Sequence, residues 1–152
     1  MDFGLDAMDT RTLSEAGVPM TVIRIDDGGQ LTVRINDSDV PVRLHLLGKD
    51  SATYRRHLNA QVRKRVDRQA KAQAAGKMVE TGNVLEEADT DALDMCVACT
   101  VKWEGVVDRN GALVPCTSDA VKSLYAQFPA IREQVEAFIS NRSNFLKGSG
   151  DA

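Results

Sequence analysis

Between residues 46 and 54 the apolar side chains change their spacing along the chain. Upstream they alternate with polar residues, as in Leu31, Val33 and Ile35, which is the period of a β-strand with one buried face. From Tyr54 onward they recur at every third or fourth position, which is the period of an amphipathic helix. This change predicts a sheet-forming N-terminal part followed by a helical part.

Three strands are expected in the N-terminal part. Residues 22–25 and 31–35 form the first two, because the Gly-containing turn between them favours a hairpin. A second turn at residues 36–39 leads into a third strand at residues 42–46. The three strands predict a small antiparallel meander with one buried face.

Two long helices are expected next. Asp50 or Ser51 can cap a helix that runs to about residue 75, because a side-chain oxygen satisfies amides of the first turn. After a glycine-containing break, a second helix covers about residues 85–102, with acidic residues near its positive N-terminal end.

The rest of the chain predicts a short hairpin and two more helices. Residues 106–114 contain Asn-Gly, a strong hairpin signal. Thr117 or Ser118 caps a short helix, and Pro129 starts the last helix, where its fixed φ is favourable.

The predicted fold class is α+β: a small N-terminal antiparallel β-meander followed by a mainly α-helical C-terminal part with a short β-hairpin. Residues 19–147 are expected to form a single domain, with the meander over 19–47 and the helical part over 50–147. Residues 1–18 show no sustained period and are interpreted as a flexible arm, and residues 148–152 as a flexible tail.

Charge is segregated in the middle of the chain. Residues 49–77 hold nine basic residues and two acidic ones, whereas residues 78–94 hold six acidic residues and no basic one. The basic helix could follow nucleic-acid phosphates, but the net charge of the chain is −3 and only Tyr54 lies nearby as a stacking platform. A solvated basic face, or pairing with the acidic segment across an antiparallel helix pair, is the favoured interpretation.

The sequence predicts neither a metal nor a cofactor. Cys96 and Cys99 form a C-x-x-C motif, but both fall inside an expected helix and no second motif completes a zinc site. They are therefore interpreted as core residues, and Cys116 has no ligand spacing to either histidine. No serine or cysteine stands near a histidine with an orienting acid, so no enzymatic activity is expected.

Nothing in the sequence indicates a membrane or an export signal. No apolar run approaches the roughly 20 residues that span a bilayer. Residues 1–6 lack the basic start and apolar centre of a signal peptide. A cytoplasmic location is expected.

Two segments resemble those of phage tail assembly chaperones. Residues 138–145, with the sequence FISNRSNF, are similar to the end of that family's signature, and residues 46–55, LLGKDSATYR, resemble the strand and basic-helix entry of one subgroup. The resemblance covers about residues 40–147 in order. It implies a non-enzymatic protein that binds the tape measure protein of a long-tailed phage or prophage, keeps it soluble and assists assembly of the tail tube.

The resemblance also implies partners and a location. The tape measure protein is the expected partner, and the tail tube protein and a second copy of the chain are further candidates. The expected location is the host cell cytoplasm, with the protein absent from the mature virion. The alternative is a structural virion subunit of the tail or of the head-tail connector.

An aromatic and aliphatic stripe near the C-terminus is the candidate docking surface. It is either core or a face for an apolar partner, because both look alike in sequence. The residues expected to contact the partner are Tyr125, Phe128, Ile131 and Phe138.

Overall fold

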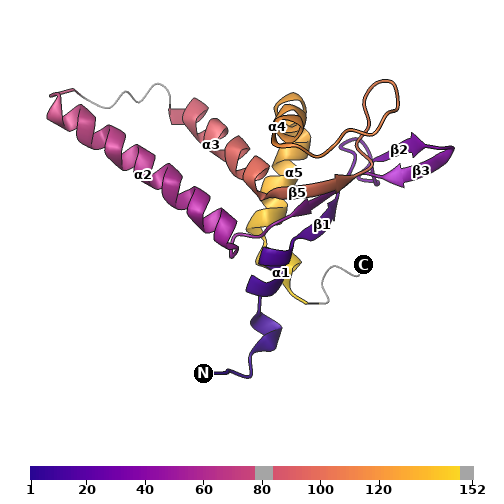
Figure 1. The fold of residues 1–152 in the computed structure, drawn as a ribbon, viewed down its shortest axis with the longest axis horizontal. Coiled ribbons are helices and arrows are strands. Elements are labelled where there is room, and N and C mark those ends of the chain that lie inside the picture. Colours follow the sequence, from indigo (N-terminus) through magenta and orange to yellow (C-terminus); the bar gives the residue numbers. More distant parts are fainter. Residues whose placement is uncertain (78–83, 148–152) are drawn as a thin grey trace.

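The computed structural model of the chain describes residues 1–77 and 84–147. Antiparallel strands form its N-terminal part, and helices with one further strand form its C-terminal part (Figure 1). The α+β prediction is confirmed. The expected tail at residues 148–152 lies outside the described residues.

The main sheet has three strands in the order β1-β4-β5. β1 (Val18–Thr21) and β5 (Thr100–Glu104) both pair antiparallel with β4 (Arg43–Leu46). Leu44 lies opposite Met20 on one side and opposite Trp103 on the other. The meander expected over residues 19–47 is therefore wrong in its strand pairing. The central strand β4 pairs with β5, which follows the third α-helix of the chain.

A separate two-stranded hairpin lies beside this sheet. β2 (Thr32–Ile35) pairs with β3 (Ser38–Pro41) through the two residues Asn36 and Asp37. Both have positive φ, 50° and 64°, as the two-residue turns of hairpins require, and Asn and Asp tolerate that conformation. The hairpin expected between residues 22–25 and 31–35 is reduced to one bridge, between Ile23 and Gln30.

The first two long helices pack against each other. α2 (Ala52–Ala74) begins where the Ser51 hydroxyl accepts a hydrogen bond from the Tyr54 amide, as expected. α3 (Val84–Cys99) ends three residues earlier than expected, because β5 starts at Thr100. Pairing with β4 takes residues 100–102 out of the helix.

The last helices begin where the sequence predicts. α4 (Ser118–Gln127) is capped by the Thr117 hydroxyl, and α5 (Pro129–Ser140) starts with proline. α5 ends at Ser140, because Asn141 is extended and its side chain caps the following 3-10 helix η2 (Arg142–Phe145). The hairpin expected at residues 106–114 is a single bridge between Val107 and Leu113.

One hydrophobic core lies between the three-stranded sheet and α3, α4 and α5. Leu44, Leu46, Cys99 and Val135 are fully buried at its centre. This core packs the sheet and the helices together, and so it positions the loops and helix ends that line the site described below.

The expected arm at residues 1–18 is shorter in the structure. α1 (Arg11–Ala16) docks on the body, with Ser14 buried and its carbonyl accepting from the Gly48 amide at 3.1 Å. Gly48 makes this contact possible, since a Cβ there would lie 2.3 Å from the Ser14 hydroxyl. Residues 1–9 remain exposed, with the short 3-10 helix η1 (Asp6–Met8) among them.

Candidate protein-binding groove

An open apolar groove of about 670 Å³ lies where the loop before β2, the loop after β5 and the α4–α5 junction meet. We call it the apolar groove. The side chains that line it are mostly aliphatic or aromatic, and they include Ile23, Ile25, Leu31, Val33, Val106, Val107, Leu124, Phe128 and Ile131.

A glycine brings the loop after β5 into the groove wall. Gly105 has φ +74°, and a Cβ at this position would lie 2.6 Å from the Pro41 carbonyl oxygen. Only glycine combines that conformation with so close an approach. The chain therefore passes tightly over the end of β3 and presents Val106 and Val107 to the groove.

Gln134 of α5 fixes the opposite wall. Its amide nitrogen donates to the Ile23 carbonyl oxygen, and its amide oxygen accepts from the Ile23 amide, both at 2.9 Å. The Gln134 side chain thus makes the two backbone hydrogen bonds with Ile23 that a neighbouring strand would otherwise make. The Ile23 backbone is held beside α5 while its side chain stays 47% exposed.

Large apolar side chains of the groove stay exposed to solvent. Phe128 is 50% exposed and Ile25 is 83% exposed. Scattered exposed apolar residues are ordinary, but a contiguous group in a hollow is a candidate interaction site.

The charges at the rim are paired with one another. Arg24 donates to Asp26 at 2.7 Å and lies 3.7 Å from Asp27. The hydrogen bond from Arg24 lowers the pKa of the Asp26 carboxyl. Since these charges are already paired and the Gln134 amide is used by Ile23, the groove offers apolar contact rather than polar anchoring.

The structure places the four expected contact residues in two different environments. Phe128 and Ile131 line the apolar groove. Tyr125 is in the core, 1% exposed, with its hydroxyl 2.6 Å from that of Thr100. Phe138 is partly buried and packs edge-to-face on Phe145, with ring centroids 5.6 Å apart.

Other groove residues were missed by the sequence analysis. Ile23 and Ile25 were assigned to a hairpin strand, and the loop valines to a second hairpin. The available signal was Val22-Ile23, two adjacent apolar residues in an alternating segment, which places apolar side chains on both faces.

The two segments that carry the family resemblance meet in the structure. Arg142 donates two hydrogen bonds to Asp50, each of 2.9 Å. Gly48 also lies against Phe145, whose ring would be 3.0 Å from a Cβ at that position. These residues join α1, the start of α2 and η2, none of which lines the apolar groove.

The expected pairing of the basic and acidic segments is confirmed. α2 and α3 run antiparallel (Figure 1), with ion pairs between Arg65 and Asp91 and, at 2.6 Å, between Arg68 and Glu87. Gln61 also donates to the Asp91 carbonyl oxygen at 2.9 Å.

The cysteines are placed as core residues. Burial raises the pKa of the Cys96 and Cys99 thiols to about 12. Within residues 1–77 and 84–147, no cluster of three or more His, Cys, Asp or Glu side chains could hold a metal ion.

Comparison of the chain with protein-family models, curated proteins and solved structures finds no match. The resemblance to tail assembly chaperones therefore rests on the sequence segments named above. None of the helices in the described part of the chain has the length and apolarity to cross a membrane.

Proposed function

We propose that this protein is a phage tail assembly chaperone that binds the tape measure protein through the apolar groove. The observation that carries the proposal is the groove itself, an apolar hollow whose rim charges are internally paired. The resemblance of residues 46–55 and 138–145 supplies the family.

A helix is the occupant that fits the groove chemistry best. Small-molecule sites combine apolar walls with a few polar groups that orient the ligand. Here Arg24 is engaged by Asp26, and Gln134 by the Ile23 backbone. An amphipathic helix needs no such anchors, because it lays apolar side chains one turn apart into the hollow.

The tape measure protein would present such helices. A long helical protein with an exposed apolar stripe self-associates, and small proteins bound along the stripe shield it. Binding to the unassembled partner stabilises its soluble form by mass action, and tail tube subunits then displace the chaperone. In this proposal the protein acts in the host cytoplasm and does not enter the virion.

Co-expression with the tape measure protein of the same phage tests the proposal. We expect the tape measure protein to remain in the soluble fraction and to copurify with the chaperone, and the chaperone to be missing from purified virions. Failure to bind the tape measure protein would overturn the proposal. Stoichiometric presence in virions would instead assign the chain as a structural subunit of the tail or of the head-tail connector.

A further inference from the structure

One side of α2 carries a stripe of exposed side chains, here called the α2 stripe. Its members are Arg55, Asn59, Val62, Val66, Gln69 and Gln73. The steps between them are four, three, four, three and four residues, which is the spacing of the a and d positions of a coiled coil. All six are exposed, and the central Val62 and Val66 are 49% and 58% exposed. At about 100° per residue, the six positions fall within an arc of about 80°.

Packing within one copy does not account for the α2 stripe. The side chains of Gln61, Arg65 and Arg68 bond to α3. Their positions are centred about 110° around the helix from the middle of the stripe. The stripe therefore lies beside the contact with α3 rather than within it, and its two valines are left for another helix to cover.

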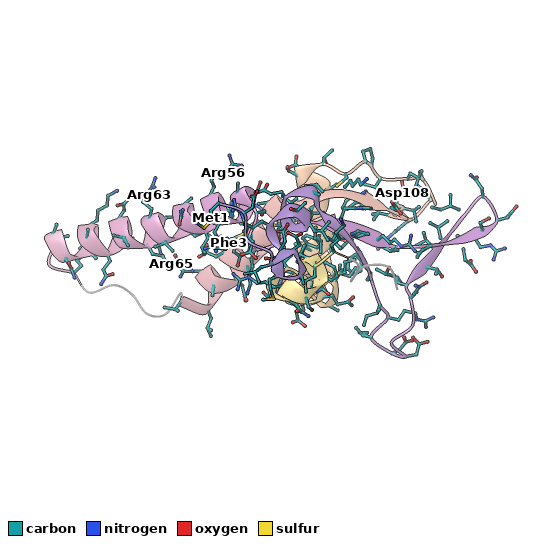
Figure 2. All side chains as sticks on the ribbon, turned by 90° about the horizontal axis from the view of Figure 1, so that it is seen from below. Met1, Phe3, Arg56, Arg63, Arg65 and Asp108 are labelled. Carbon is teal, nitrogen blue, oxygen red and sulfur yellow. The ribbon has the colours of Figure 1, made fainter. Side chains whose placement is uncertain are left out.

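The α2 stripe is nearly free of charge, although α2 is strongly charged. Of the eight Asp, Lys and Arg residues of α2, only Arg55 lies on the stripe. Arg63 and Arg65 border its centre, one on each side, and Figure 2 shows them projecting from opposite sides of α2. An uncharged seam with charged borders is typical of a helix that pairs with another helix.

We propose that α2 of one copy pairs antiparallel with α2 of a second copy through the α2 stripe. The order of side chains along the stripe is symmetric about its midpoint, with two valines in the centre and an amide side chain beyond each valine. In an antiparallel pair, Val62 of each copy packs on Val66 of the other copy. A two-fold axis through the midpoint requires a self-complementary surface of this kind.

The flanking residues match in the same register. Asn59 of one copy lies opposite Gln69 of the other, and two amide side chains can exchange hydrogen bonds. Arg55 lies opposite Gln73, so the seam opposes no like charges. A parallel pair would instead place the two copies of Arg55 against each other. It would also bring the two bodies together, because the body lies at the N-terminal end of α2 (Figure 1).

Other occupants explain less of the α2 stripe. Nucleic acid would find one cation there, Arg55, and would leave the valines uncovered. A helix of another protein would cover the valines, but it would not require the symmetric order of the six side chains. A second copy of the chain accounts for the exposure, the low charge and the symmetry together.

The contact is small, and Arg63 weakens it further. Two layers of valine are flanked by polar side chains, so we expect a weak and reversible dimer, as for other small interfaces. Arg63 forms no ion pair with any residue of the described ranges, and its two copies would face each other near the two-fold axis. Salt should therefore strengthen the dimer by screening this repulsion. The inference does not depend on the proposed function, because it concerns contacts between copies of the chain.

Sedimentation equilibrium of the full chain over a range of concentrations tests the contact. We expect a reversible monomer–dimer equilibrium that shifts towards dimer as salt is added. Val62→Gln with Val66→Gln should weaken association about tenfold or more and keep the helix, because glutamine is a good helix former. Ala60→Gln with Ala74→Gln is the matched control, since both alanines are exposed on α2 outside the stripe.

Arg63→Glu tests the antiparallel register. Mixed with the parent, this variant should form a mixed dimer, because the introduced carboxylate meets Arg63 of the parent copy. At low salt the mixed dimer should bind about two- to fivefold more tightly than either homodimer, as expected for an exposed ion pair, and high salt should remove the difference. A parallel pair predicts no such preference. Circular dichroism checks that each variant is folded.

Three results would overturn the inference. A parent that stays monomeric up to its solubility limit excludes the dimer. A folded Val62→Gln, Val66→Gln variant that associates like the parent places the contact on another surface, and a mixture without preference for the mixed dimer excludes the antiparallel register. If the parent stays monomeric and the valine variant loses binding to the tape measure protein, the α2 stripe binds a helix of that partner instead.

Discussion

Asp50 connects three parts of the chain that are distant in sequence. It accepts a hydrogen bond of 2.6 Å from the Thr10 hydroxyl and two of 2.9 Å from the Arg142 guanidinium. Arg55 lies 3.7 Å away. These contacts, from Arg142 first and Thr10 second, lower the pKa of the carboxyl from 3.8 to about 2.

The low pKa of Asp50 makes stability depend on pH. Because the folded-state pKa is below the unfolded value, the ionised group stabilises the fold above about pH 4, and this contribution is lost as pH falls towards 2. The side chain of Asp50 is 11% exposed but that of Arg142 is 53% exposed, so solvent screening reduces the contribution to about 1–2 kcal/mol.

Asp50→Asn is therefore expected to lower the melting temperature at pH 7 by about 2–4 °C per kcal/mol lost. At pH 2 the variant and the parent should melt at nearly the same temperature, as measured by circular dichroism. Asp39→Asn is the control, because it removes a carboxylate from an exposed pair with Arg34. Equal melting of Asp50→Asn and the parent at pH 7 would contradict the role assigned to Asp50.

At the scale of single elements, local signals predicted the helix starts and missed the strand pairing. Ser51, Thr117 and Pro129 act on the amides of their own first turns, so their effect can be read from a few residues. β5 followed the helical spacing of α3 in sequence, but it is a strand because Trp103 pairs opposite Leu44. Tertiary pairing overrides such local spacing.

The four residues expected to contact a partner divide between the core and the apolar groove for a related reason. Tyr125 and Phe128 are three residues apart and would share a face of one continuous helix. α4 ends at Gln127, however, so the chain turns between them. Tyr125 remains in the core while Phe128 points into the groove. The end of the helix, rather than the choice of residues, separates core from surface here.

The pairing of α2 with α3 gives a prediction about single ion pairs. Arg65→Asp removes the bond to Asp91 and places two carboxylates together, so it should destabilise the fold by about 0.5–1 kcal/mol. Combining it with Asp91→Arg should recover most of the loss in urea unfolding. Arg63→Asp is the control, since Arg63 has no ion pair within the described residues. An equal loss in the control would show that helix charge, and not the pair, matters.

At the scale of the whole molecule, the apolar groove is assembled from parts of the chain that are distant in sequence. It is built from the loops beside β2 and β5 and from the α4–α5 junction, whereas α2 projects from the other side of the fold (Figure 1).

The groove can be tested by a substitution that spares the core. Phe128→Ser keeps the backbone bonds between α4 and α5 and removes a side chain that is already 50% exposed, so it should lower stability by only about 1 kcal/mol. It should nevertheless reduce the soluble fraction of co-expressed tape measure protein, with binding weakened about tenfold or more. Leu113→Ser, which removes a 65% exposed apolar side chain outside the groove, is the matched control. If folded Phe128→Ser protein solubilises the tape measure protein as well as the control does, binding takes place on another surface.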